Sequence, residues 1–226
     1  MSGARMSGAR ISMQYCLSRH CRTHASGPDR YFDVWSLWYD HSPMQILLFG
    51  PVQRAVSAAL ASRLSSGRLL DIGTGTGRLL ERVGQGRPGL ALFGLDRSAG
   101  MLRAAHQART QLGLVRAAAE TLPFPNESFD VVTTTLSFHH WSDQREALSE
   151  VRRVLRPGGA FALADVSIDD LPPWAPRMAA GRMLAHGLPL EVRHRLLEDA
   201  GLQMVDERRA LHGRWIPLTV AERPSG

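Results

Sequence analysis

The residues Leu69-Leu-Asp-Ile-Gly-Thr-Gly-Thr-Gly-Arg-Leu-Leu80 decide the fold of this chain. A short apolar run leads into three alternating glycines and then into an apolar helical pattern, which predicts a strand, a tight turn and a helix. Gly73, Gly75 and Gly77 lack the Cβ that would keep a ligand off the backbone, and glycine tolerates the positive φ angles of such turns. Asp71 stands at the end of the predicted strand. The stretch therefore predicts a site for a nucleotide-like cofactor.

Two other nucleotide sites have a different glycine spacing. Dinucleotide-binding folds use G-x-G-x-x-G, with the third glycine three residues after the second. Arg78 occupies that position here, and the spacing is G-x-G-x-G. A phosphate-binding loop requires a lysine, which this sequence lacks altogether. A tight strand–helix connection that binds nothing remains the alternative for this motif taken alone.

Strand-like segments alternate with helical ones after the N-terminal region. The predicted strands are 68–72, 90–95, 114–116, 129–135, 159–165, 202–210 and 214–222, and the predicted helices are 51–65, 77–83, 98–111, 142–155 and 190–200. Such alternation is typical of a parallel sheet with helices on both faces. The short connection at 209–214 predicts that the last two strands form an antiparallel hairpin. We therefore expect an α/β fold with a doubly wound, seven-stranded, mostly parallel sheet.

Polar residues cluster where these strands end, and ligands of doubly wound sheets bind beyond the carboxyl ends of the strands. Asp71, Asp96, Thr135 and Asp165 all take such positions. A carboxylate at Asp96, after the second strand, can accept hydrogen bonds from both hydroxyls of a ribose. A helix-capping role for Asp96 is the structural alternative. The pattern favours a ribose-bearing cofactor.

The charge of the chain lies mainly in its first 30 residues. They hold Arg5, Arg10, Arg19, Arg22 and Arg30 against one acid, whereas the whole chain has a net charge of +6. A nucleic-acid-binding surface would need a basic face on the folded part, so we expect no nucleic-acid partner. No apolar run approaches the roughly 18 residues that span a bilayer. We therefore expect a cytoplasmic protein without a membrane span.

The N-terminal segment also holds both cysteines. Cys16, His20, Cys21 and His24 match no common zinc spacing, and we assign no metal site. The segment repeats Met1-Ser-Gly-Ala-Arg5 as Met6-Ser-Gly-Ala-Arg10, and the chain combines abundant arginine with no lysine, as GC-rich bacterial coding produces. We expect residues 1–30 to be a disordered basic tail.

Four motifs in order resemble those of the class I S-adenosylmethionine-dependent methyltransferases, specifically the type 11 group that includes the ubiquinone/menaquinone-biosynthesis enzymes. The glycine motif is 69–77, and Phe93-Gly-Leu-Asp-Arg-Ser98 resembles the family's ribose-binding acidic motif. Residues 119–130 resemble its adenine-side loop, and Val154-Leu-Arg-Pro-Gly-Gly159 resembles its turn before the fifth strand. The resemblance covers 65–165 closely and implies S-adenosyl-L-methionine as cofactor.

The resemblance also implies roles for individual residues. Asp71 would help to hold the ammonium of the cofactor, Asp96 would bind ribose, and Met101 would lie against adenine. The other residues implied in cofactor binding are Gly73, Thr74, Gly75, Thr76, Arg97, Ala119, Glu120 and Thr135. Relatives often have an adenine-binding Asp before the Ala-Glu pair. Ala118 stands there in this chain, so the backbone of Ala119 and Glu120 would have to serve.

Methyl transfer to a hydroxyl needs a general base, because a hydroxyl is a weak nucleophile. Histidine is the natural base near neutral pH, and a carboxylate can orient it. His140, just past the fourth predicted strand, is the favoured base, with His139 second and Asp165 as the orienting group. Packing or capping is the alternative role of the histidines.

The flanks of the cofactor domain are expected to shape the acceptor pocket. The aromatic run Tyr31 to Tyr39 belongs to an expected helical lid at 31–66, although it could simply cover a sheet edge. The methyltransferase domain would then be 67–226 with a small insert at 168–187, where Met178, Met183 and Leu184 could line the pocket. We expect a small organic acceptor, with O-methylation favoured over C-methylation of a quinone precursor. A non-catalytic cofactor-binding module is the third alternative, and the sequence leaves the oligomeric state open.

Overall fold

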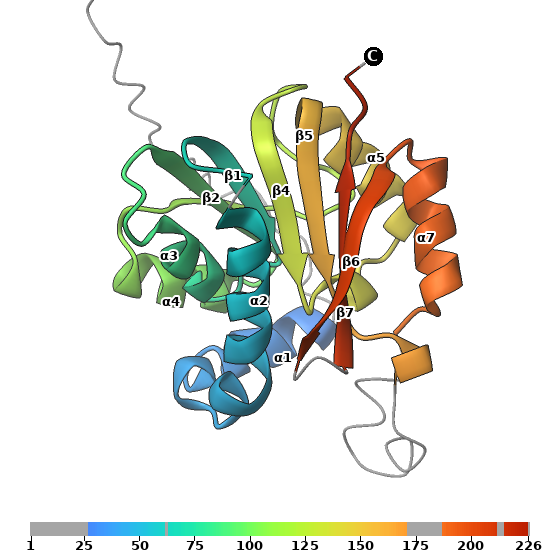
Figure 1. The fold of residues 1–226 in the computed structure, drawn as a ribbon. Coiled ribbons are helices and arrows are strands. Elements are labelled where there is room, and N and C mark those ends of the chain that lie inside the picture. Colours follow the sequence, from blue (N-terminus) through green and yellow to red (C-terminus); the bar gives the residue numbers. More distant parts are fainter. Residues whose placement is uncertain (1–26, 62, 171–186, 212–214, 226) are drawn as a thin grey trace, which may run out of the picture.

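A computed structural model of the 226-residue chain describes residues 27–61, 63–170, 187–211 and 215–225. Seven strands make one sheet in the order β3-β2-β1-β4-β5-β7-β6 (Figure 1). The strands are β1 (Gly67–Ile72), β2 (Leu90–Asp96), β3 (Gly113–Arg116), β4 (Phe129–Thr135), β5 (Leu155–Ala164), β6 (Gln203–Leu211) and β7 (Trp215–Glu222). The predicted α/β fold and its doubly wound sheet are confirmed.

The sheet is parallel from β3 to β5, β6 runs in the same direction as these strands, and only β7 runs against the others. β1 pairs in parallel with β2 and β4, and β4 pairs in parallel with β5. β7 lies antiparallel between β5 and β6. The antiparallel pairing of β6 with β7 confirms the predicted C-terminal hairpin. The carboxyl ends of β1, β2, β4 and β5 meet at one end of the sheet, and the sequence motifs that follow these strands lie together there.

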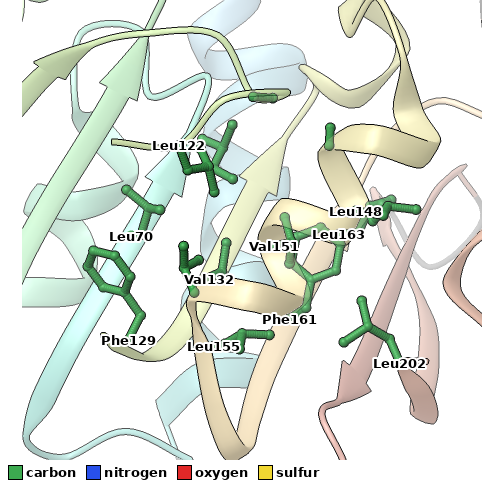
Figure 2. Packing of buried hydrophobic residues seen from close by; sticks show 14 of the residues in the cluster. Leu70, Leu122, Phe129, Val132, Leu148, Val151, Leu155, Phe161, Leu163 and Leu202 are labelled. Carbon is green, nitrogen blue, oxygen red and sulfur yellow. The ribbon is translucent and has the colours of Figure 1, made fainter. Parts of the chain in front are cut away.

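Helices cover both faces of the sheet, since side chains alternate along each strand. Leu70, Val132 and Phe161 point to the face covered by α5 (Gln144–Val154) and α7 (Leu190–Asp199). Figure 2 shows these side chains in one cluster with Leu148 and Val151 of α5. The opposite face packs on α2 (Gly50–Ala61) and α3 (Arg78–Gly84). The remaining helices are α1 (Gly27–Trp35), α4 (Ala99–Ala108) and the short turns η1 (Tyr39–His41), η2 (Gln45–Phe49), η3 (Phe138–His140) and η4 (Ile168–Asp170).

Local details differ from the expectations at several element ends. α5 begins at Gln144 rather than at residue 142, because Asp143 caps it: the Asp143 side chain accepts a hydrogen bond from the amide of Glu146 at 3.0 Å. The apolar run 46–49 forms the π-helical turn η2 and leads directly into α2. The helix α1 begins at Gly27, inside the segment expected to be disordered.

Some predictions concern residues that the structure does not describe. They are the tail up to residue 26 with its cysteines, and the insert residues Met178, Met183 and Leu184. In the described part of the chain, no helix is long and apolar enough to cross a membrane.

Candidate cofactor site and catalytic dyad

The glycine turn connects β1 to α3 directly beside the end of β2. The amides of Gly73 and Thr74 both donate to the carbonyl of Leu95, at 2.8 and 3.0 Å. Gly73, Gly75 and Gly77 have φ angles of 73°, 55° and 82°, in the left-handed region that favours glycine. The backbone conformation of the turn therefore favours glycine at all three positions, whether or not a ligand binds.

The three glycines differ in what surrounds them. A Cβ on Gly73 would lie 1.9 Å from Ser137 Oγ, and one on Gly77 would lie 2.7 Å from a methyl carbon of Leu112. At Gly75 the nearest atom to an added Cβ is Met101 Sδ at 4.0 Å. Gly73 and Gly77 therefore leave room for neighbouring parts of the protein, whereas Gly75 borders open space. A ligand could approach the backbone at Gly75.

Asp96 links the glycine turn to the helix that follows β2. One carboxylate oxygen accepts from the amide of Gly75 and the other from the amide of Ser98, each at 2.8 Å. Both the ribose role and the capping role foreseen for this residue are compatible with the position, since a carboxylate oxygen can accept more than one hydrogen bond. Asp96 is thereby held at the rim of the turn.

Asp71 is buried at the end of β1, and one of its oxygens has no hydrogen-bond partner among the described residues. Burial raises the pKa of Asp71 to about 7, and the neighbouring Asp96 carboxylate adds to the rise. The hydroxyl of Thr74 interacts with the Asp71 carboxyl and acts against the rise. The hydroxyl of Thr135 is buried without a partner in the described part of the chain. Unpaired buried polar atoms are uncommon and call for a partner. Together with the open side of Gly75, they fit a polar, cationic ligand such as S-adenosylmethionine.

The other residues implied in cofactor binding divide into two groups. Thr76 and Met101 are buried around the glycine turn, and Ala119 is buried in the adjacent core cluster. The side chains of Arg97 and Glu120 both contact the start of the α5 region instead. Arg97 donates to the hydroxyl of Ser142 at 3.2 Å, and Glu120 accepts from the amide of Ser142 at 2.6 Å. Any part of Glu120 in cofactor binding would fall to its backbone.

An ion-pair network that the sequence did not suggest fastens the N-terminal segment to the glycine turn. The hydroxyl of Thr76 donates to Asp40 Oδ1 at 2.6 Å. Arg109, which is almost fully buried, donates to the carbonyl of Thr76 at 2.9 Å and pairs with Asp40 at 3.3 Å. Glu81 of α3 holds the same guanidinium at 2.9 Å. These contacts join residues 28 to 69 positions apart, so no local sequence pattern indicates them.

A second acid of the N-terminal segment, Asp33, caps α4 from outside. It accepts from the hydroxyl of Ser98 at 2.6 Å and from the amide of Gly100 at 2.8 Å. Although burial alone would raise the pKa of Asp33, these hydrogen bonds and nearby arginines hold it below its usual value. Gly100 is required here, because a Cβ would lie 2.8 Å from the backbone of Asp33. The segment 31–49 is thus bound to both sides of the candidate site.

We expect Asp40→Ala to loosen this attachment. Hydrogen bonds to charged groups contribute roughly 1.5–3 kcal/mol, so local opening of residues 31–49 should become about 10–100 times more frequent. Amide hydrogen exchange measures this opening. Asp206→Ala, which removes the exposed ion pair with Arg208 on β6, is the control and should leave exchange in 31–49 unchanged. Equal exchange in Asp40→Ala and the parent would contradict the role of Asp40.

The histidine pair after β4 lies beside the carboxyl end of β5. His139 Nδ1 lies 2.7 Å from Asp165 Oδ1, and the amide of His139 donates to Asp165 Oδ2 at 2.8 Å. The side chains of both residues are buried. An ionised carboxylate only accepts hydrogen bonds, so the proton of a neutral His139 sits on Nδ1 and the lone pair on Nε2. Nε2 has no partner among the described residues.

Asp165 is kept ionised although it is fully buried. Burial acts to raise its pKa, but His139 and Arg193 hold the pKa below the usual value. Arg193 of α7 is itself fully buried and donates to the carbonyls of Asp165 and Val166 at 3.2 and 2.8 Å. The sequence analysis missed Arg193. The one feature of the sequence that could have indicated its role is the position of this arginine on the apolar side of the predicted helix 190–200.

His140, the base that the sequence favoured, lies differently. Its ring is tilted by 45° to the ring of His139, with 3.9 Å between the centroids. It packs edge-on against Phe32 of α1 at 5.3 Å, and the residue is exposed. Asp165 is therefore paired with His139 rather than with His140. The chain reaches this arrangement through Leu136, whose φ of 54° is unusual for a leucine and marks local backbone strain next to the site.

Comparisons with known proteins agree with this geometry. Residues 70–163 match the family described as "Methyltransferase domain". The chain is 37% identical over 117 residues to a demethylmenaquinone methyltransferase of Thermus thermophilus, which covers 50% of this chain and 52% of the relative. It is 36% identical over 108 residues to a ubiquinone/menaquinone biosynthesis C-methyltransferase of Geobacter sulfurreducens, covering 45% and 42%. The chain spans about half the length of these curated relatives.

A solved structure extends the comparison of the fold beyond the matched segment. The crystal structure of a SAM-dependent methyltransferase from Aquifex aeolicus superposes with a TM-score of 0.66 at 18% identity, covering 86% of this chain and 98% of that one. At this identity the likeness concerns the fold. The sheet order, the glycine turn and the matched segment agree, and the chain belongs to the class I S-adenosylmethionine-dependent methyltransferases, as a distant relative of the menaquinone and ubiquinone methyltransferases.

Proposed function

We propose that this protein transfers the methyl group of S-adenosylmethionine to the hydroxyl of a small aromatic acceptor, with His139 as the general base. The observation that supports this most is the buried His139–Asp165 pair, in which Nε2 of His139 has no partner among the described residues. Family membership supports the donor. A base with an orienting carboxylate supports an acceptor whose proton must be removed.

The cofactor, when bound, supplies a methyl group already activated by its sulfonium sulfur. The work left to the protein is to position the acceptor and to receive its proton. Nε2 of His139 would take the hydroxyl proton, and the carboxylate of Asp165 would stabilise the resulting imidazolium through Nδ1. Arg193 would keep Asp165 ionised and in place. Positioning in such sites contributes about 7–11 kcal/mol at best, and general base catalysis about 10²–10⁴-fold.

The N-terminal segment would exclude water from this reaction. Its inner aromatic rings pack against one another, with Trp35 and Tyr39 at 4.8 Å and Tyr39 and Phe49 at 5.2 Å between centroids. Phe32 reaches His140 beside the dyad. Because Asp33 and Asp40 fasten the segment on both sides of the glycine turn, we assign it the lid role expected from the sequence. The same aromatic surface favours an apolar, aromatic acceptor.

Methylation at carbon is the second candidate. The relatives from Thermus thermophilus and Geobacter sulfurreducens are named as a menaquinone and a quinone methyltransferase, the latter acting at carbon. Removal of a phenolic proton also makes the ring carbons of a hydroquinone nucleophilic, so the same base would serve both outcomes. Product analysis separates them: a cofactor labelled with ¹³C at the methyl group gives an O-methyl or a C-methyl resonance. We expect the O-methyl signal with simple phenols and catechols.

The cofactor assignment is tested through Asp96. We expect Asp96→Asn to weaken S-adenosylmethionine binding about 10–100-fold in calorimetry, the loss expected for hydrogen bonds to a charged group. Asp143→Asn is the matched control, because Asp143 also caps a helix with its side chain but lies on α5. It should bind the cofactor like the parent. Equal weakening in both variants, or no binding by the parent protein, would contradict the assignment.

Turnover to S-adenosylhomocysteine separates an enzyme from a binding module. The parent should form this product with at least one phenolic acceptor, and the amount should depend on acceptor concentration. Cofactor binding without turnover across phenols, catechols and hydroquinones would contradict the proposed reaction while leaving the cofactor site intact.

A further inference from the structure

Within residues 31–47 the N-terminal lid carries six exposed large apolar side chains, which we call the outer apolar patch. Its members are each more than half exposed: Tyr31 60%, Val34 57%, Leu37 76%, Trp38 55%, Ile46 78% and Leu47 63%. Elsewhere in the described part of the chain, the exposed large apolar residues are Ile168, Val192 and Val205, which are scattered and less exposed. Contiguous exposed apolar surface usually marks an interaction site.

The lid is apolar on two sides, and its inner side is already occupied. Phe32, Trp35, Tyr39 and Phe49 pack inward on one another and toward His140. Tyr31, Val34 and Trp38 of the patch each stand one position before an inner aromatic residue and so repeat the same helical spacing. A short helical segment with apolar residues on all sides is normally buried on all sides. The outer apolar patch therefore needs a second apolar medium.

The charges around the patch indicate what that medium is. Within residues 31–61 the acids are Asp33 and Asp40, and both are turned inward onto Ser98, Gly100, Thr76 and Arg109. The outer side of the lid thus presents no free carboxylate within this range. The chain before it, residues 1–30, holds five arginines and one acid. An anionic surface would be attracted by the arginines without opposition from the patch.

We propose that the outer apolar patch docks the protein peripherally on an anionic lipid bilayer. Tryptophan and tyrosine favour the interface between water and lipid, where their rings are apolar and their polar atoms stay hydrated. Firm attachment usually takes two signals, and this chain supplies exposed apolar residues that a basic segment precedes in the sequence. The lid also covers the end of the sheet that holds the candidate site (Figure 1). Docking would place that end toward the membrane, independently of which acceptor is methylated.

Vesicle co-sedimentation of the full chain tests this proposal. We expect binding to phosphatidylcholine vesicles that contain phosphatidylglycerol, weaker binding to phosphatidylcholine alone, and a loss at high salt, because exposed charges are screened. Leu37→Glu combined with Ile46→Glu should lower affinity for the anionic vesicles about tenfold or more, since it replaces the two most exposed apolar side chains of the patch by charges. Both positions are exposed, so the fold should persist.

Two further variants make the result specific. Val205→Glu changes an apolar residue of β6 that is 44% exposed and outside the patch, and it should bind vesicles like the parent. Replacing Arg5, Arg10, Arg19 and Arg22 together by glutamine should reduce binding to anionic vesicles and leave binding to neutral ones unchanged. Equal binding by the Leu37→Glu/Ile46→Glu variant and the parent would overturn the proposal. So would a concentration-dependent dimer that this variant abolishes in light scattering without any vesicle binding, which would assign the patch to a second copy of the chain.

Discussion

His139→Ala is expected to lower the rate of methyl transfer about 10²–10⁴-fold while the affinity for S-adenosylmethionine changes little. The reason is the position of Nε2, which is the free end of a histidine held by Asp165 at 2.7 Å. Cofactor contacts are expected from the glycine turn and Asp96, which the substitution leaves in place. Single-turnover kinetics with a phenolic acceptor, together with calorimetry of cofactor binding, measure the two quantities separately.

His140→Ala is the control, since the two residues are adjacent in η3 and similar in size. It should reduce the rate far less, because His140 contacts Phe32 and the ring of His139 rather than Asp165. Added imidazole should restore part of the activity of His139→Ala by acting as a diffusible base. A large loss in His140→Ala with a normal rate in His139→Ala would return the base to the residue that the sequence alone favoured.

Asp71→Asn is expected to change both stability and cofactor binding in a pH-dependent way. The pKa of Asp71 is raised from 3.8 to about 7 by burial. Between about pH 4 and pH 7 the folded protein therefore binds a proton that the unfolded chain has lost, and the free energy of unfolding falls as pH rises through this window. The loss amounts to a few kcal/mol, on the order of 4 at most. Asp71→Asn has no proton to lose at this position.

Thermal unfolding without ligand therefore separates the two proteins. The Tm of the parent should fall between pH 5 and pH 8, whereas the Tm of Asp71→Asn should fall less over the same interval.

A bound cationic cofactor favours the ionised form of Asp71, because the negative carboxylate attracts it. Its binding to the parent at pH 6.5 should release protons, seen in calorimetry as a dependence on buffer ionisation enthalpy. Asp71→Asn should bind about 10–100 times more weakly and release no protons at this site. Proton release that persists in this variant would assign the titration to another group.

The sequence predicted the glycine turn and the acids at the strand ends for local reasons. A left-handed φ at Gly73, Gly75 and Gly77 is a property of a few consecutive residues, and only glycine accepts it freely. The mostly parallel sheet followed from the alternation of apolar strand-like runs with helical ones, since consecutive parallel strands need helical crossovers. Asp71 and Asp96 come to the same edge of the sheet because both follow neighbouring parallel strands.

The contacts that hold the N-terminal segment to the glycine turn could not be predicted from local sequence patterns. Asp40 and Arg109 are 69 residues apart, and their meeting at Thr76 depends on the path of the chain before α2 and after α4. Arg193 likewise reaches Asp165 only because α7 packs against the end of β5. Polar pairs of this kind have no periodic signature, since each partner is a single residue whose neighbours serve other contacts.

The sequence by itself determined a methyltransferase fold, a glycine turn between the first strand and its helix, and a histidine–carboxylate pair at adjacent strand ends. The tertiary structure decided which histidine joins Asp165. Neighbouring residues of a 3₁₀ turn project about 120° apart, so the order of His139 and His140 in the chain does not reveal which one faces β5. The path of the backbone through Leu136 and η3 turns His139 inward and leaves His140 against the lid.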